Sequence, residues 1–291
     1  MPASNVTFFL LFGSKFRRLI IKKFSTPASG AATPIFASGL LSGGDSDITG
    51  AIRSGAGAGP AASKAEPLPV AIGPQALREA ALSGDAAAQF EIATRFAEGR
   101  GVPQSFADAA NWYERATLQG SIPAAYRLGS LYEKGQGVTK DLVTARRYYT
   151  LAAEAGNAKA MHNLAVLYAE GIDGKPDYRQ ASQLFRRAAD LGLRDSQYNL
   201  GILYARGLGV DQNMAESFKW FALASGQGDT DAQKKRDDVA ARLDAQALLA
   251  ARLAVQTWAA QPLDPAANEV RPSADWDRAD SAQGRKPAGR S

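Results

Sequence analysis

The sequence predicts an all-helical solenoid built from about four helix–turn–helix units of 36 residues, and three observations lead to this fold class. The first is a glycine that recurs every 36 residues, at Gly84, Gly120, Gly156, Gly192 and Gly228. The second is another glycine column with the same step, at Gly99, Gly135, Gly171 and Gly207. The third is a set of apolar columns in the same register, such as Ile92, Leu128, Leu164 and Leu200. Self-similarity at a fixed period is the sequence signature of a repeat protein.

Each unit is expected to contain two helices joined by a short loop. In the first unit, apolar side chains at positions 88, 92 and 96 share one face at helical spacing and predict a helix over 86–98. Gly99 follows it, and glycine reaches the left-handed conformation of a helix C-terminus without strain. The second helices are expected to begin after a column of residues whose side chains accept backbone N–H bonds: Ser105, Asp141, Asp177 and Asn213.

The residue after each 36-spaced glycine is expected to cap the next first helix. Four of the five residues in this column have a side-chain oxygen suited to capping: Asp85, Ser121, Asn157 and Asp229. Leu193 is the exception. Small residues hold further columns, among them Ala93, Gly129, Ala165 and Gly201, and these predict a close approach between neighbouring helices.

One helix pair cannot bury its own apolar face, so the units are expected to stack. The solenoid is predicted over 73–228, where 73–84 is half a unit, and a charged C-terminal capping helix over 229–260. Residues 1–72 are predicted to be a disordered leader followed by a linker rich in Gly, Ala, Ser and Pro. The tail over 261–291 contains scattered charges and four prolines, and it is predicted to be disordered.

The net charge of +5 comes from the first 24 residues, which contain five basic and no acidic side chains. The rest of the chain contains 29 of the 34 Lys and Arg residues and all 29 Asp and Glu residues, so it is neutral overall. Without excess positive charge to neutralise phosphates, no nucleic-acid partner is expected. The apolar run Phe8–Phe12 is too short to span a bilayer, and the charges follow it rather than precede it as in a secretory signal. Two alternatives stay open: a basic segment that touches a membrane surface, or a disordered leader.

The chemistry-bearing residues argue against an enzyme. Cysteine is absent and His162 is the single histidine, so no thiolate nucleophile, metal site or cofactor is predicted. His162 occupies a column of rings, with Phe90, Tyr126 and Tyr198 at the other positions. The angular position of this column leaves two alternatives: packing between neighbouring first helices, or exposure on the concave surface.

Two stretches carry a resemblance to a known family. They are YRLGSLYEKGQGVTKDLVTARRYYTLAAEAGN over 126–157 and YNLGILYARGLGVDQNMAESFKWFALASGQGD over 198–229. The G-x-G-V loop before a capped helix and the A-A-x-x-G ending resemble the Sel1-like repeat family, a relative of the tetratricopeptide repeats. The third unit departs from the pattern, because Asp173 replaces the second loop glycine and Gly174 stands where valine is usual.

A narrower resemblance concerns the block that ends in AQKKRDDVAARLDAQALLAARLAVQTW. It is similar to the Sel1-repeat region of PodJL-type polar localisation factors of alphaproteobacteria, and a truncated or rearranged relative is the expectation. This resemblance implies a cell-envelope setting at the cell pole, either inner-membrane-associated or periplasmic. The alternative is a cytoplasmic protein, since no signal peptide or membrane span is evident in the sequence.

The predicted function is a non-enzymatic scaffold that binds a protein or peptide partner on the concave face of the solenoid. The alternative is a module that binds peptidoglycan. The predicted contact residues lie on first helices, away from the packed arc of each helix. They are Tyr126, Arg127, Ser130, His162, Asn163, Val166, Tyr198, Asn199 and Ile202. Rings supply contact area there, and Asn and Arg can hydrogen-bond an extended backbone.

Overall fold

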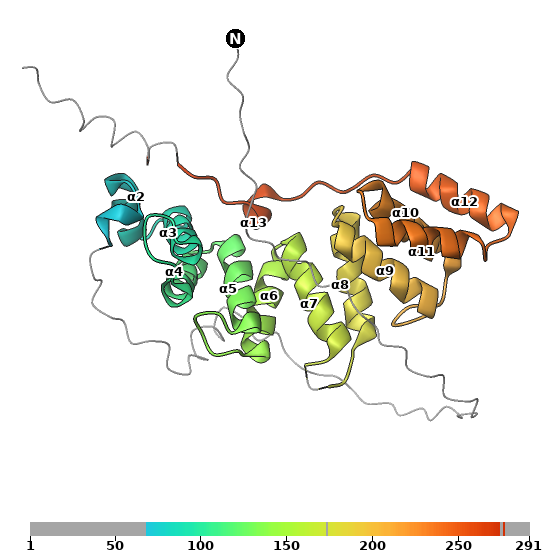
Figure 1. Ribbon diagram of the computed structural model, residues 1–291, viewed down its shortest axis with the longest axis horizontal. Helices are drawn as coiled ribbons and strands as arrows, with labels where there is room; N and C mark the ends of the chain where they lie inside the picture. The colour runs from blue at the N-terminus through green and yellow to red at the C-terminus, as the bar shows by residue number, and fades with distance from the viewer. Residues whose placement is uncertain (1–67, 173, 274–275, 277–291) are drawn as a thin grey trace, which may run out of the picture. The chain divides into compact units, whose positions relative to one another are not determined.

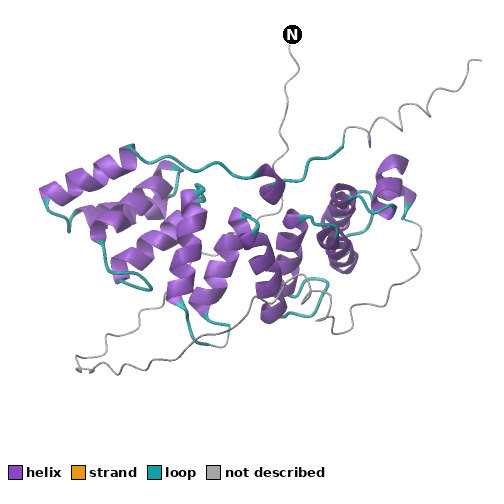
Figure 2. Ribbon diagram, turned by 180° about the vertical axis from the view of Figure 1, so that it is seen from behind, coloured by secondary structure: helices purple, strands orange, loops and turns teal. Residues whose placement is uncertain are grey.

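The computed structural model describes residues 68–172, 174–273 and Trp276, and those from Pro69 onward belong to one compact unit. Figure 1 shows stacked helix pairs, and the view from behind shows helices and loops without a strand in this described part (Figure 2). The four pairs are α3 (Ala86–Glu98) with α4 (Phe106–Leu118), α5 (Ile122–Lys134) with α6 (Leu142–Glu154), α7 (Ala158–Glu170) with α8 (Tyr178–Asp190), and α9 (Arg194–Arg206) with α10 (Met214–Gly226). They confirm the predicted fold class.

Shorter helices flank the four pairs. The 3-10 turn η1 (Val70–Ile72) and α2 (Gln75–Leu82) come first, and α2 packs on α3. Helices α11 (Thr230–Ala240), α12 (Ala245–Gln256) and α13 (Pro265–Asn268) follow the last pair. The predicted leader and linker lie outside the described residues up to position 67, as does the basic segment within them. Residues 68–72 were also expected to be disordered linker, and the structure instead gives them a defined course, with Leu68 and Ile72 buried.

The helix ends follow the local signals of the sequence. Gly99 adopts φ 71° at the C-terminus of α3, and the side chains of Ser105, Asp141, Asp177 and Asn213 accept N–H bonds at the starts of the second helices. Asp85, Asn157 and Asp229 cap first helices in the same way. Ser121 differs from the prediction, because its side chain makes no capping bond. Pro123, at the second position of α5, has no N–H to donate there.

One backbone hydrogen bond closes the loop in each of the four units. The N–H of each second-helix cap donates to the carbonyl of an aromatic residue in the preceding first helix, at 2.8–3.0 Å. The pairs are Ser105 with Phe96, Asp141 with Tyr132, Asp177 with Tyr168, and Asn213 with Tyr204. The third unit therefore keeps the closure even though its loop sequence departs from the pattern; Asp173 itself lies outside the described residues.

Small residues allow the helices of a unit to approach each other closely, as the sequence predicted. A Cβ added to Gly129 would lie 2.8 Å from the ring of Tyr149, and one added to Gly201 would lie 2.9 Å from the ring of Phe221. The second helix of each unit also packs on the first helix of the next unit. The aromatic rings and small columns together fill the core of the solenoid.

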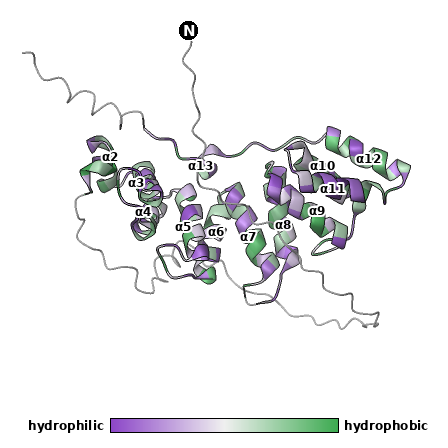
Figure 3. Ribbon diagram, in the orientation of Figure 1, coloured by the Kyte–Doolittle hydropathy of each residue, from purple (hydrophilic) through white to green (hydrophobic). Residues whose placement is uncertain are grey.

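The C-terminal cap contains two helices where the sequence analysis expected one. Helix α11 ends at Ala240, and Asp244 starts α12 by accepting a bond from the N–H of Ala247. The turn lets both helices cover the end of the last pair, where Phe218, Val239 and Ala251 share a core cluster. Helix α11 is strongly hydrophilic in Figure 3, in agreement with the predicted charged capping helix.

The segment over 261–273 was expected to be disordered, and the structure instead gives it a defined course. It contains α13, which lies against α5 far back along the solenoid (Figure 1). The predicted disorder over 277–291 concerns residues outside the described part of the chain.

Buried and half-buried tyrosines make the fold sensitive to alkali. Burial raises the pKa of Tyr113, Tyr132 and Tyr149 above the usual range, and the carboxylate of Glu133 raises that of Tyr149 further. These hydroxyls stay protonated in the folded chain above about pH 10, where the unfolded chain ionises, so the folded state binds more protons. The free energy of unfolding is therefore expected to fall as pH rises above about 10. Urea unfolding at about pH 8 and about pH 10.5 tests this, and an unchanged midpoint would contradict it.

Candidate interaction surface

The ring column predicted on first helices lies inside the solenoid. Tyr126, His162 and Tyr198 are 7%, 0% and 9% exposed. Each ring packs against a ring of the second helix in its own unit, and centroids are 5.3–6.0 Å apart in all four units. The four pairs are Phe90 with Tyr113, Tyr126 with Tyr149, His162 with Phe185, and Tyr198 with Phe221. The rings therefore pack within each unit, and exposure on the concave surface is wrong for Tyr126, His162 and Tyr198. Packing between neighbouring first helices, the other alternative, occurs at His162, which contacts α9.

His162 also joins two neighbouring units. Its Nδ1 lies 2.8 Å from the Oγ of Ser196 on α9, and both side chains are fully buried. Ser196 stands in a column whose other members are Ala88, Ala124 and Ala160. His162 stands where the other units have phenylalanine or tyrosine, and Ser196 stands where they have alanine. The two residues thus form a buried polar pair. That double departure from the repeat was a signal in the sequence for this contact.

Asn163 takes part in a polar network at the boundary of units two and three. Its Nδ2 donates to the Tyr149 hydroxyl at 2.9 Å, and this hydroxyl donates to Oε2 of Glu133 at 2.6 Å. Glu133 is only 8% exposed, so burial and its negative charge hold the pKa of Tyr149 well above the usual range. Asn163 itself is half-buried. The network ties α5, α6 and α7 together.

Five of the nine predicted contact residues are therefore buried, and the prediction that they face a partner is wrong for them: Tyr126, His162, Val166, Tyr198 and Asn199. Neighbouring helices cover these positions. The remaining four are half-buried and keep part of their surface open: Arg127, Ser130, Asn163 and Ile202. We call these four residues the first-helix surface. Partner binding by the first-helix surface stays a prediction.

A second surface was missed by sequence reasoning, and it carries a segment of the chain itself. We call residues 156–159 and 190–192 the turn edge, and residues 261–273 the C-terminal segment. At the boundary of units two and three, Nδ2 of Asn157 donates to the carbonyl of Ala267 at 2.6 Å. The N–H of Ala158 donates to Oδ1 of Asn268 at 3.0 Å, and Nδ2 of Asn268 donates to the carbonyl of Gly156 at 3.2 Å.

The next unit boundary holds an earlier part of the same segment. The N–H of Gln261 donates to the carbonyl of Asp190 at 2.8 Å. A Cβ added to Gly192 would lie 3.2 Å from the Cβ of Ala260. As the C-terminal segment advances along the sequence it contacts an earlier unit, so it runs antiparallel to the order of the units.

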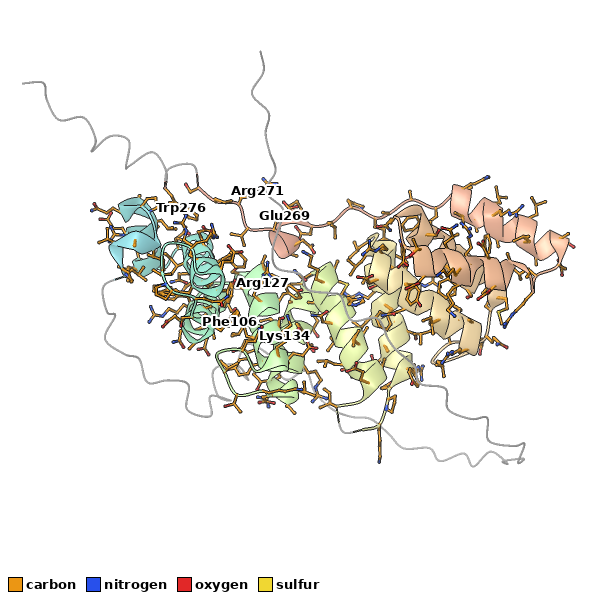
Figure 4. The ribbon with its side chains drawn as sticks, viewed as in Figure 1. Phe106, Arg127, Lys134, Glu269, Arg271 and Trp276 are labelled. Carbon is orange, nitrogen blue, oxygen red and sulfur yellow. The ribbon has the colours of Figure 1, made fainter. Side chains whose placement is uncertain are left out.

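Charges accompany these hydrogen bonds. The side chain of Lys159 lies within electrostatic range of Glu269 and Arg127. Desolvation and the positive charge of Arg127 lower the pKa of Lys159, and the carboxylate of Glu269 opposes this shift. Arg127 on α5 and Glu269, just after α13, are labelled in Figure 4. The turn edge thus offers one basic group, Lys159, to an acidic residue of the segment.

The described residues show no arrangement suited to metal chemistry or to a bilayer. No group of three His, Asp or Glu side chains that could hold a metal ion occurs within the described ranges. None of the helices in this part of the chain has the length and apolarity needed to cross a membrane.

Comparisons with known proteins agree with the stacked helix pairs. A family model described as Sel1 repeat matches residues 86–121, 122–157, 158–193 and 194–229. The crystal structure of a Sel1 repeat protein from Oxalobacter formigenes is 31% identical, with a TM-score of 0.52 over 61% of this chain and 75% of that one. The chain belongs to the Sel1 repeat family. Sel1 repeats generally mediate protein binding.

A second solved structure is more distant from this Sel1 protein. It is a protective antigen present in uropathogenic Escherichia coli strains that displays an SLR fold. It is 22% identical, with a TM-score of 0.33, and the match covers 74% of this chain and 60% of that chain. No curated protein sequence matches the chain.

Proposed function

We propose that this Sel1 protein is a non-enzymatic scaffold that binds a partner polypeptide on its first helices and their N-terminal turns. One observation carries the proposal: the solenoid already holds a polypeptide segment, its own C-terminal segment with the short helix α13, through hydrogen bonds that reach across 110 residues of sequence. Amide side chains that bond to a backbone suit a peptide ligand, because every peptide presents the same C=O groups and, except at proline, the same N–H groups.

The first-helix surface extends this binding region. Arg127 lies within electrostatic range of Lys159 on the turn edge, so the two surfaces adjoin at the boundary of units two and three. Ser130, one turn further along α5, and Ile202 on α9 share a column two units apart. The position between them in the column, Val166, is buried, so a partner that follows the stacking direction would meet this column in every second unit.

Site-specific photo-crosslinking in the cells that make the protein tests the surface assignment. A benzophenone amino acid is placed at Arg127 or Ile202 on first helices. The matched controls are exposed second-helix positions in one column, Asn111, Arg147 and Gln183. We expect one common crosslinked protein from both first-helix positions and none from the control column, because partners bind the first helices.

Crosslinks from the control column alone would overturn the surface assignment. Sedimentation of the chain with purified peptidoglycan, without a protein crosslink, would favour the cell-wall alternative.

The envelope and cell-pole setting is likewise a proposal, and it is supported by the resemblance of the repeat block to PodJL-type factors. A fluorescent fusion that is spread evenly through the cytoplasm would contradict it.

A further inference from the structure

The turn edge recognises the C-terminal segment through an asparagine that other units lack. Asn157 is 2% exposed and uses both ends of its amide. Its Oδ1 caps α7 by accepting from the N–H of Ala160 at 2.8 Å, while its Nδ2 donates to the carbonyl of Ala267. The equivalent residues of the other units cannot offer that amide donor, since they are Asp85, Ser121, Leu193 and Asp229.

The C-terminal segment also binds through an asparagine, Asn268. Asn268 accepts from the N–H of Ala158, a donor at the start of α7 that has no partner within its own helix. It donates in return to the carbonyl of Gly156. Aspartate at 268 would keep the acceptor but place a negative charge against this carbonyl, and alanine would lose both bonds. The turn edge therefore distinguishes asparagine from similar side chains at this position.

Hydrogen bonds within the C-terminal segment fix the backbone conformation around Asn268. Asp264 caps α13 by accepting from the N–H of Ala266 at 2.9 Å, and Pro265 occupies the first helical position. Nδ2 of Asn268 also donates to the carbonyl of Asp264 at 2.8 Å. A ligand that holds its bound conformation through local bonds loses less entropy on binding. A capped proline turn is thus part of what the turn edge recognises.

The segment is held at the surface and not in the core. Pro262, Leu263, Asp264 and Glu269 are exposed, whereas Ala267 is 1% exposed against the turn edge. Removal of residues 261–269 would uncover little apolar area besides Ala267, whereas Val270 is half-buried and Trp276, after the segment, is buried. The segment can therefore leave the turn edge while the helix pairs stay stacked.

We propose that the turn edge is a peptide-binding site for a partner protein whose segment has a capped proline turn followed by asparagine and an acidic residue, and that the C-terminal segment is its built-in competitor. This inference deepens the proposed function and rests on it, because it names the partner class of a binding scaffold. A tethered competitor acts at an effective concentration of the order of millimolar. Partner binding is therefore weak until the segment is released.

The test uses the full chain and a fluorescent synthetic peptide, QPLDPAANEVRPS, which has the sequence of residues 261–273. Its affinity is measured by fluorescence anisotropy for the wild type and for Asn268→Ala, which weakens the tethered segment. We expect the peptide to bind Asn268→Ala at least about tenfold more tightly than the wild type, because the competitor has lost its amide bonds. The matched control Asn111→Ala changes an exposed asparagine of α4 and should behave as the wild type.

A second substitution tests the site itself. Asn157→Asp in the Asn268→Ala background keeps the helix cap, since Asp85 and Asp229 cap α3 and α11 at the same position, but it removes the donor to the peptide. The gain in peptide affinity should then be lost while circular dichroism and the unfolding midpoint stay close to those of the Asn268→Ala chain. A peptide in which the asparagine equivalent to Asn268 is alanine should not bind.

Three outcomes overturn the inference. One is equal peptide affinity for all the variants. Another is that the peptide does not bind to the Asn268→Ala chain although hydrogen exchange shows that the C-terminal segment has been released. The third is a wild-type dimer that has exchanged its C-terminal segments, because the occupant would then be a second copy of this chain. A crosslinked partner on the first-helix surface together with a failed peptide test would leave the scaffold function standing and remove only this inference.

Discussion

Replacement of Gly137 by alanine is expected to lower the free energy of unfolding by about 3–5 kcal/mol. Gly137 is the second glycine of the loop between α5 and α6, at φ 71°. An added Cβ would lie 2.1 Å from the carbonyl carbon of Phe106 and 2.3 Å from the nitrogen of Ala107. Both atoms belong to the backbone at the start of α4 in the preceding unit (Phe106 is labelled in Figure 4). A backbone cannot rotate away as a side chain can, so the two units must separate.

Gly120→Ala is the matched control for this prediction. Gly120 also has a left-handed conformation, at φ 89°, but an added Cβ would meet no atom within 4 Å. Alanine there should cost only the conformational strain of about 1–2 kcal/mol. Urea unfolding followed by circular dichroism measures both variants. Equal losses of stability in the two variants would show that the close approach of Gly137 to the backbone at the start of α4 does not add to the cost of alanine there.

The same contact recurs where the loop has the second glycine. An added Cβ would lie 2.0 Å from a backbone oxygen both at Gly101, facing Ala71, and at Gly209, facing Tyr178. The second loop glycine therefore marks a point at which one unit touches the previous one. The sequence presented it as a loop signal, and its role between units became visible only when the units were stacked.

Helix positions were predictable because their signals are local. The end of α3 at Glu98 and the caps of the second helices depend on residues within one turn of the boundary. A period of 36 residues then repeated each signal along the chain. The four helix pairs and their order followed from these signals alone.

The contact surface was harder to predict because it depends on more than one helix. The angular position of Tyr126, His162 and Tyr198 on their own helices places them beside the packed arc, at an apparent surface. Rings of the second helices cover that position in the folded chain. A helical wheel describes a single helix and contains no information about the rings of its neighbour.

The C-terminal segment escaped prediction for a different reason. Its proline content and lack of an apolar period are typical of disorder, and the structure stabilises it by hydrogen bonds with Asn157 and Ala158, 110 residues away. No local pattern encodes a contact of that separation. The amide in the capping column at Asn157, which no other unit has there, could have pointed to it.

Replacement of Trp220 by alanine is expected to cost about 3–5 kcal/mol of unfolding free energy and to loosen the C-terminal cap. Trp220 is fully buried, and its Nε1 donates to Oε2 of Glu216 at 2.9 Å. The guanidinium of Arg186, on the preceding unit, lies 4.9 Å from its ring centroid. Trp258, between α12 and the C-terminal segment, packs edge-on at 6.2 Å. One side chain thus connects two units with the end of the cap.

Two variants separate these contributions. Trp220→Phe keeps an aromatic face for Arg186 and Trp258 but loses the bond to Glu216, so its cost should be about 1–2 kcal/mol. Trp112→Ala removes the equivalent tryptophan of the first unit, which is 8% exposed and lies under Arg115.

Hydrogen exchange in α11 and α12 is the deciding measurement. Because each unit of a solenoid contacts only its neighbours, Trp220→Ala should raise exchange in both cap helices, whereas Trp112→Ala should raise it only near α4. Equal exchange in the cap for the two variants would mean that Trp220 stabilises the solenoid as a whole and does not anchor the C-terminal segment. In that case the segment would depend on its bonds to the turn edge, those of Asn157, Asn268 and Gln261, and release of the competitor would need no change at Trp258.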